Sequence, residues 1–241
     1  MDIEKGALAL GLLGLWLSSR KGGSKGISLD FENTPRDTKG LYYGRLVSPE
    51  FASAVISLAE ELGVEPNDLM TLFRIERGRS RDKKSLGSGV YHKYTSKDGV
   101  LHEGNFSYGL FGIQPSVAVW LGTTPEAIYE MSDLEQLNLV KKYFVKHGWD
   151  KDGKHPLTQY PKFGEQKPGE VSQFDQLYSG VWGGQSMVDA GLDDVLISKE
   201  KDPVNYDRNK DADITHDDKI TKKDVLTIAR GIRRAGSKKA L

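Results

Sequence analysis

The strongest constraint on the fold is a series of segments in which apolar residues recur every three or four positions, each opened by a capping residue. The first begins at Ser48, whose hydroxyl can accept a hydrogen bond from the first helical turn, and Pro49 suits the first helical position. Gly63 can end this segment in the left-handed conformation. We therefore predict a helix between these residues, with an inward face made of Phe51, Val55, Leu58 and Leu62.

The same reasoning predicts further helices, which are expected from residue 66 to about 77, from 115, from 125 and from 133 to 147. The last of these has a capping box, Ser132 with Glu135, and Gly148 as its stop. Its inward residues are expected to be Leu134, Leu137, Val140 and Phe144. Another apolar stretch runs from 171 to 184, and a final helix is expected from residue 222.

The segment between the second and third predicted helices has a composition typical of β-strands. Two runs rich in Tyr, Val and Thr flank Lys97, Asp98 and Gly99, a composition typical of a β-hairpin with a tight turn. The predicted fold class is therefore mainly α, of the α+β type with one small hairpin.

Composition excludes several functions. The 241 residues carry 34 Lys and Arg against 34 Asp and Glu, so the net charge is zero and no nucleic-acid partner is expected. There is no Cys, which excludes disulfides, thiolate metal sites and cysteine nucleophiles.

The two ends of the chain differ from its middle. An apolar segment at 6–19 is shorter than the about 20 residues of a membrane-spanning helix. Two alternatives stay open for it: a helix packed on protein or a poor signal segment, or contact with a membrane. Residues 20–47 have the composition of a linker. We expect a folded domain over 48–190 and a separate element over 191–241.

Glu76 is the first candidate for chemistry. Leu69, Leu72 and Phe73 precede it by seven, four and three residues, so its carboxyl group lies along the apolar stripe near a helix end. Burial and the helix dipole both raise the pKa of a carboxyl there, as a general acid requires. The alternative is an ordinary ion pair with Arg74, Arg77 or Arg79.

The stretch NFSYGLFGIQPSVAVWLG, residues 105–122, resembles the signature of the soluble lytic transglycosylase and goose-type lysozyme superfamily. The resemblance extends over roughly 50–185. It departs from the family pattern at Gly112, where the family has Gln, and at Ser179, where it has Asn. The resemblance implies a lysozyme-like helical domain in which Glu76 is the catalytic acid. The substrate-binding residues that it implies are Ser107, Tyr108, Gly109, Gln114, Tyr143 and Tyr178.

The resemblance implies cleavage of the β-1,4 bond between N-acetylmuramic acid and N-acetylglucosamine in peptidoglycan glycan strands. One acid suffices when the muramyl 6-hydroxyl attacks, whereas hydrolysis needs a second carboxylate. Glu103, on the second hairpin run, is the candidate for that role, and Asp98 is expected to be only the turn residue. The three tyrosines would either stack on sugars or belong to the core.

The tail contains a second motif, which resembles the EF-hand or dockerin calcium loop. In one register the Ca²⁺ ligands are Asp207, Asn209, Asp211, Asp213 and Asp218. A second register uses Asp213, Thr215, Asp217 and Asp224. The other possibility is a solvated acidic loop before the final helix. We expect a structural Ca²⁺ and no cofactor for catalysis.

The order of the parts suggests a phage virion protein that opens the cell wall during genome entry, with other virion or tail proteins as possible partners. Two alternatives are a non-catalytic structural or wall-binding virion protein and a host enzyme of cell-wall remodelling.

Overall fold

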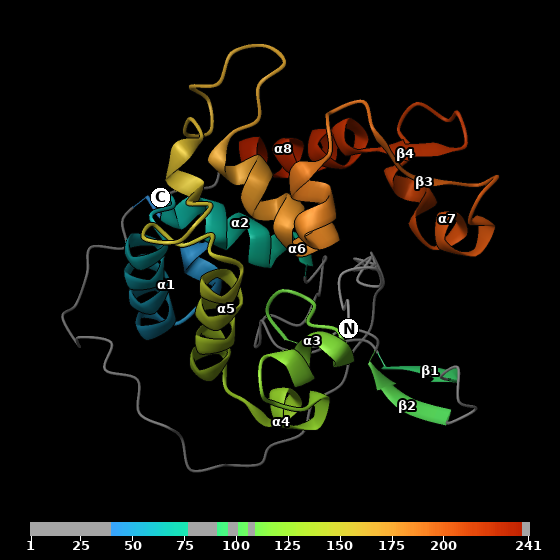
Figure 1. Ribbon diagram of the computed structural model, residues 1–241. Helices are drawn as coiled ribbons and strands as arrows, with labels where there is room; N and C mark the ends of the chain where they lie inside the picture. The colour runs from blue at the N-terminus through green and yellow to red at the C-terminus, as the bar shows by residue number, and fades with distance from the viewer. Residues whose placement is uncertain (1–39, 77–90, 96–100, 106–108, 238–241) are drawn as a thin grey trace.

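The computed structural model describes residues 40–76, 91–95, 101–105 and 109–237 (Figure 1). This part of the chain is mostly helical and has two small antiparallel sheets. The helices are α1 (Pro49–Leu62), α2 (Pro66–Glu76), α3 (Pro115–Trp120), α4 (Pro125–Glu130), α5 (Asp133–His147), α6 (Gln173–Asp189), α7 (Pro203–Asn209) and α8 (Lys222–Ser237). The strands are β1 (Tyr91–Thr95), β2 (Leu101–Asn105), β3 (Val195–Ser198) and β4 (Lys219–Thr221).

The predicted helix caps are confirmed. The Ser48 hydroxyl accepts a hydrogen bond from the N–H of Phe51, and Ser132 and Glu135 form both halves of a capping box. Gly63 and Gly148 end α1 and α5 with φ of 72° and 70°, where other residues are strained. Local capping chemistry therefore sets the limits of these two helices.

The buried faces of α1 and α5 agree with the prediction except at Leu134. This side chain is 37% exposed, whereas the other inward residues predicted for α5 are fully buried. The buried face of α5 is centred on Val140 and includes polar Gln136, so Leu134 falls to its side. The prediction for Leu134 was wrong because a polar residue occupies the inward position in the first turn.

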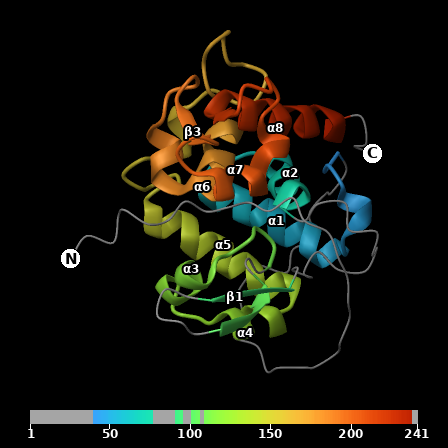
Figure 2. The ribbon, with the colours of Figure 1, turned by 90° about the vertical axis from the view of Figure 1, so that its right-hand side faces the viewer.

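The predicted hairpin is present as strands β1 and β2, which pair antiparallel. Tyr91 lies opposite Asn105 and Thr95 lies opposite Leu101. The turn residues Lys97, Asp98 and Gly99 lie outside the described residues. Figures 1 and 2 show the hairpin with α3, α4 and α5 on one side of α1 and α2, and α6, α7 and α8 on the other.

The folded part begins earlier than Ser48. Leu41 is 7% exposed and belongs to the core, and the N–H of Tyr42 donates a hydrogen bond to Asn67 at 2.7 Å. A linker over 20–47 is therefore wrong for its last residues. The apolar segment at 6–19 lies outside the described residues, and within the described part no helix could cross a membrane.

The carboxyl-terminal segment is not a separate element. Ile220, Val225, Leu226 and Ala229 belong to the same hydrophobic core as the residues of α1, α2, α5 and α6. Helix α8 packs on both α2 and α6. Described residues from Leu41 to Ala229 therefore contribute to one core, in place of the two units expected on either side of residue 190.

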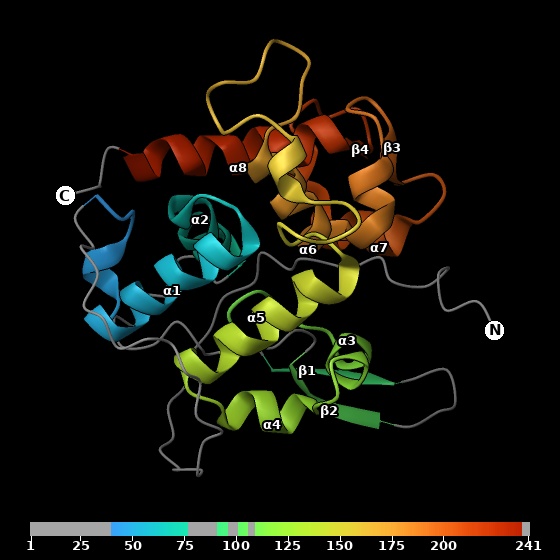
Figure 3. The ribbon, with the colours of Figure 1, turned by 60° about the vertical axis from the view of Figure 1, so that its left-hand side comes forward.

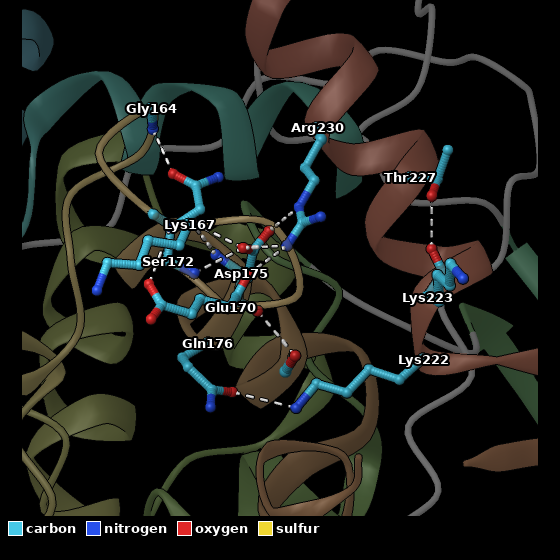
Figure 4. Close-up of polar contacts among 12 residues, drawn as sticks. Gly164, Lys167, Glu170, Ser172, Asp175, Gln176, Lys222, Lys223, Thr227 and Arg230 are labelled. Atoms are coloured by element: carbon cyan, nitrogen blue, oxygen red, sulfur yellow. Dashed lines mark hydrogen bonds and ion pairs between the residues drawn. The ribbon is translucent and has the colours of Figure 1, made fainter. Parts of the chain in front are cut away.

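Helix α8 is attached to α6 by a buried ion pair (Figure 4). The Arg230 guanidinium donates to both carboxylate oxygens of Asp175, at 2.8 and 2.7 Å. Asp175 is fully buried, and the same carboxylate accepts hydrogen bonds from the N–H and hydroxyl of Ser172, the N-cap of α6. One carboxylate thus caps one helix and holds another, an arrangement that satisfies a buried charge.

A second buried pair attaches α8 to α2. Arg233 Nε donates to Asp68 Oδ1 at 2.6 Å, and the Arg233 guanidinium lies over the rings of Tyr42 and Phe163. Asp68 is fully buried, and its second oxygen has no partner among the described residues. Burial raises the pKa of Asp68 to about 6 although Arg233 opposes the rise.

We predict that Arg233→Met destabilises the protein in a pH-dependent way. At pH 7.5 the variant leaves Asp68 charged, buried and unpaired, which costs about 3–5 kcal/mol. Loss of Arg233 raises the pKa of Asp68 further above its ordinary value of 3.8. Asp68 then takes up a proton at pH 5, so the loss is smaller there. Urea unfolding at both pH values measures the difference.

The matched control is Lys141→Met, which breaks an ion pair with Glu61 whose side chains are about half exposed. That pair contributes at most about 1 kcal/mol, and its loss should change little between the two pH values. Equal losses for Arg233→Met at pH 5 and 7.5 would contradict a charge-based role for Arg233.

Candidate active site and acidic loop

Glu76 is the last residue of α2, and the residues below it on the apolar stripe are buried. Leu69 and Leu72 are fully buried and Phe73 nearly so, which confirms the predicted stripe. Burial raises the pKa of Glu76 from its ordinary value of 4.5 to about 8. Of the alternative partners, Arg74 lies over the Tyr43 ring at 5.9 Å, and Arg77 and Arg79 lie outside the described residues. A pKa of about 8 favours the protonated form of Glu76 at neutral pH.

Two tyrosines from other helices lie within electrostatic reach of this carboxyl group. Burial first and the Glu76 charge second raise the pKa of both Tyr143, on α5, and Tyr178, on α6. Three helices thus bring together Glu76 and two of the residues that the sequence predicted for the site. The remaining residues of the predicted group are considered below.

The two tyrosines are part of the core and do not form open stacking surfaces. Each is 6% exposed, and the Tyr143 hydroxyl donates to the Gly180 carbonyl at 2.7 Å. The Tyr178 ring stacks with Phe174 at 6.4 Å between centroids. The idea that these rings stack on sugars is therefore wrong. They lie within electrostatic reach of Glu76, which is itself partly exposed.

An aromatic cluster that the sequence did not reveal surrounds Tyr143. The ring of Tyr143 contacts Phe111, Trp120, His147 and Trp149, with centroids 4.7 to 6.1 Å apart. Trp149 is buried, whereas Trp120 is 39% exposed. The Trp120 ring also lies under the Lys146 ammonium, at 4.7 Å. These residues come from the turn before α3, from α3, from α5 and from the segment after α5, so no single periodicity indicated them.

Gly109 lies in a turn that only glycine can form. Its φ is 75°, and a Cβ there would lie 2.5 Å from Oε1 of Gln136. That buried oxygen accepts the N–H of Leu110 at 2.8 Å, and the Gln136 amide donates to the Met131 carbonyl. Gln136 thus fixes the turn that leads to α3. A polar residue at an inward helix position was the available signal for it.

The other predicted substrate residues have different positions. Gln114 is the N-cap of α3, is partly exposed and makes no capping hydrogen bond with its side chain. Ser107 and Tyr108 lie outside the described residues. Glu103 lies on β2, opposite Lys93, and Asp98 is not described.

The acidic tail folds as a helix, a loop, a short strand and a helix. The first calcium register does not fit this arrangement, because Asp207 and Asn209 belong to α7. The side-chain amide of Asn209 donates to the backbone carbonyl and to Oδ1 of Asn205, so this side chain is bound to its own helix. Asp211 lies in a short 3-10 helix (residues 210–212), and Asp218 forms an exposed ion pair with Lys199. These ligands do not converge.

The second register, from Asp213 to Asp224, fits the backbone better. Its eighth residue, Ile220, is fully buried, whereas the eighth residue of the first register, Ile214, is 42% exposed. Asp213 is buried, and its carboxylate accepts the N–H groups of Asp217 and Asp218. Asp218 has φ of 62° at the sixth position, where a calcium loop makes its sharp turn.

The carboxylates of this loop are not gathered as a bound cation would gather them. Asp224 accepts hydrogen bonds from the N–H and hydroxyl of Thr221, at 2.9 and 2.6 Å. Among the described residues, no group of three or more His, Asp or Glu side chains is placed to hold a metal. A cation therefore requires Asp224 to turn away from Thr221.

Comparison of the chain with protein-family models, curated proteins and solved structures gives no match. A function is therefore inferred from the site itself, above all from the raised pKa of Glu76.

We predict that Glu76→Gln stabilises the protein at alkaline pH. The pKa of Glu76 is higher in the folded chain than in the unfolded chain, so the folded state binds the extra proton. The stability this gives is complete below about pH 4.5 and is lost as pH rises through 8. Gln keeps the shape of the protonated form and has no proton to lose.

Urea unfolding of both proteins from pH 4.5 to 9 measures this effect. The two curves should agree at the acid end and separate up to about pH 8, with the variant more stable. Glu165→Gln, at an exposed loop position, is the control and should follow the wild type throughout. A constant difference between wild type and Glu76→Gln would show that Glu76 is already ionised in the folded protein.

Proposed function

We propose that this chain cleaves the β-1,4 bond between N-acetylmuramic acid and N-acetylglucosamine, with Glu76 as general acid. The observation that supports this most is a carboxyl group with a pKa of about 8, at the position that the sequence signature assigns to the acid. The mainly helical architecture with a small hairpin agrees with a lysozyme-like domain, which is part of this proposal.

The chemistry follows from the protonation state of one residue. Glu76 donates its proton to the glycosidic oxygen as the bond from the muramyl C1 to that oxygen breaks. The resulting carboxylate then accepts the proton of the muramyl 6-hydroxyl, whose oxygen forms the new bond to C1. The products are a 1,6-anhydro muramyl end and a free 4-hydroxyl, and Glu76 regains its proton. No water is consumed, so a second carboxylate is not required.

The walls of the site suit such a step. Tyr143 and Tyr178 keep the carboxyl group in an environment of low polarity, which favours the neutral acid before the reaction. Their own pKa values are raised, so both hydroxyls stay neutral at any pH at which the protein works. Neither tyrosine competes with Glu76 as a proton donor.

The biological setting proposed for this activity is a phage virion protein that acts on the cell wall, with glycan strands as partner. The two alternatives remain a non-catalytic wall-binding virion protein and a host remodelling enzyme. Cleavage of purified peptidoglycan separates the first alternative from the proposal.

We predict that Glu76→Gln folds normally and loses cleavage of purified peptidoglycan by about a thousandfold or more. General acid catalysis alone supplies roughly 10²–10⁴ in rate, and the same residue also acts as base. Mass analysis of the wild-type products should show 1,6-anhydro muramyl ends.

Two results would redirect this assignment. Near-normal cleavage by Glu76→Gln would remove Glu76 from the mechanism. Free reducing ends as the main product would indicate hydrolysis, which needs a second carboxylate. Glu103 would then be the first candidate to test for that role. The control variant is Glu61→Gln, which removes a partly exposed carboxylate of α1 and should cleave like the wild type.

We also propose that the loop from Asp213 to Asp224 binds a structural Ca²⁺. The oxygens that would hold it belong to Asp213, Thr215, Asp217 and Asp224 and to the carbonyl of Lys219. The burial of Ile220 and the left-handed turn at Asp218 support this register. The ion would supply charge neutralisation to an acidic loop and take no part in the proton transfer.

We predict that Ca²⁺ raises the melting temperature and that a chelator reverses the rise. An ion that binds only the native form adds about 2.7 kcal/mol at a hundredfold excess over its dissociation constant. Asp217→Ala should abolish the shift, because this exposed carboxylate occupies the fifth position of the second register. Asp207→Ala, an exposed acid on α7, is the matched control and should keep it. If Asp207→Ala abolishes the rise in melting temperature and Asp217→Ala keeps it, the first register is correct. If Ca²⁺ does not change the melting temperature of the wild type, the loop binds no structural Ca²⁺.

A further inference from the structure

Helix α8 lies against both α2 and α6, the helices that carry Glu76 and Tyr178 (Figure 3). Its attachment is made by two arginines with buried partners. Arg233 pairs with Asp68, which lies two helical turns before Glu76 on α2. Arg230 pairs with Asp175, which lies one turn before Tyr178 on α6. Arg230 therefore holds α6 one turn from its contribution to the site, and Arg233 holds α2 at the end opposite Glu76.

We propose that Arg230 and Arg233 are positioning residues for the candidate active site, which α8 maintains by holding α2 and α6 in register. This inference rests on the proposed function of Glu76. It assigns a role in the site to the carboxyl-terminal segment, which the sequence places outside the lysozyme-like region.

The physical basis is that a helix moves as a rigid element. Three helices contribute to the group formed by Glu76, Tyr143 and Tyr178, and the packing of α2 and α6 sets how close these residues lie. Loss of either ion pair leaves a buried carboxylate that must find water or a proton. The helix that carries it then shifts outward, and water reaches Glu76.

Lys222 offers a control on the same helix. Its side chain is almost fully buried, and its ammonium donates to the carbonyls of Val188 and Ala190, at 3.0 Å each. It also reaches Gln176 at 3.4 Å (Figure 4). The two short bonds hold the part of α6 that follows a break in the helix at Gly184, whose φ is 62° and ψ −155°. Lys222 thus attaches α8 mainly beyond the break, away from Tyr178.

The experiment compares three variants of the full chain: Arg230→Met, Arg233→Met and Lys222→Met. The pKa of Glu76 is measured in each by carbon NMR of side-chain carboxyl groups, with Glu76→Gln identifying the resonance. All three should lower the melting temperature. The two arginine variants should lower the pKa of Glu76 by about one unit or more, because water reaches the carboxyl group. Lys222→Met should leave it near the wild-type value.

Peptidoglycan cleavage is the second readout. Misplacement of the acid should lower the rate of the arginine variants about ten- to a hundredfold while the rate of Lys222→Met stays close to that of the wild type. Arg230→Lys and Arg233→Lys keep the charge and lose the forked geometry, so they should give intermediate values. These conservative variants replace the Met variants if the latter do not fold.

The outcomes separate the two proposals. Folded arginine variants with an unchanged pKa of Glu76 would overturn the positioning role, and so would an equal change in Lys222→Met. The wild type could fail to cleave peptidoglycan while the arginine variants still lower the pKa of Glu76. That result would reject the proposed function and leave the positioning role intact.

Discussion

The structure depends on how three carboxyl groups on adjoining helices are satisfied. Asp175 is fully buried and receives two N–H groups of Arg230 and its own helix cap. Asp68 is also fully buried and receives one N–H group of Arg233, and its pKa rises to about 6. Glu76 lies at a partly buried position with no ion pair among the described residues, and its pKa rises to about 8. Of these two raised pKa values, the higher belongs to the carboxyl group that lacks a charged donor among the described residues.

The contrast between Asp68 and Glu76 occurs within α2, whose two ends meet different surroundings. Near its start the helix faces α8, which supplies a cation and favours the charged form of Asp68. At its end the helix faces aromatic rings of α5 and α6, which favour the neutral form of Glu76. The same burial that would only cost stability at an ordinary position gives Glu76 a proton to donate at neutral pH.

Much of the fold was predictable because its signals are local. Ser48, Ser132, Gly63 and Gly148 mark helix ends through contacts within a few residues, and the hairpin follows from its turn composition. The attachment of α8 was not predictable. Arg230 and Arg233 have the same sequence signal as surface arginines, and only the tertiary fold shows that Asp175 and Asp68 lie opposite them. The exposure of Leu134 and the burial of Gln136 could not be predicted for the same reason. The apolar pattern of a helix does not specify which groups on a neighbouring element its side chains will contact.

The candidate site shows the same division between local and distant signals. The stripe that ends at Glu76 is a property of one helix, so spacing made Glu76 a candidate, and only the resemblance to the transglycosylase signature favoured it over an ordinary ion pair. Its raised pKa comes from burial in the tertiary fold, and the two tyrosines within its electrostatic reach, Tyr143 and Tyr178, lie more than 60 residues away in sequence. An unpaired carboxyl in such surroundings destabilises the folded chain at high pH, and other contacts must offset that loss. One buried ion pair of α8 lies on α2, which carries Glu76, and the other lies on α6, which carries Tyr178, so the carboxyl-terminal segment packs on both helices of the site.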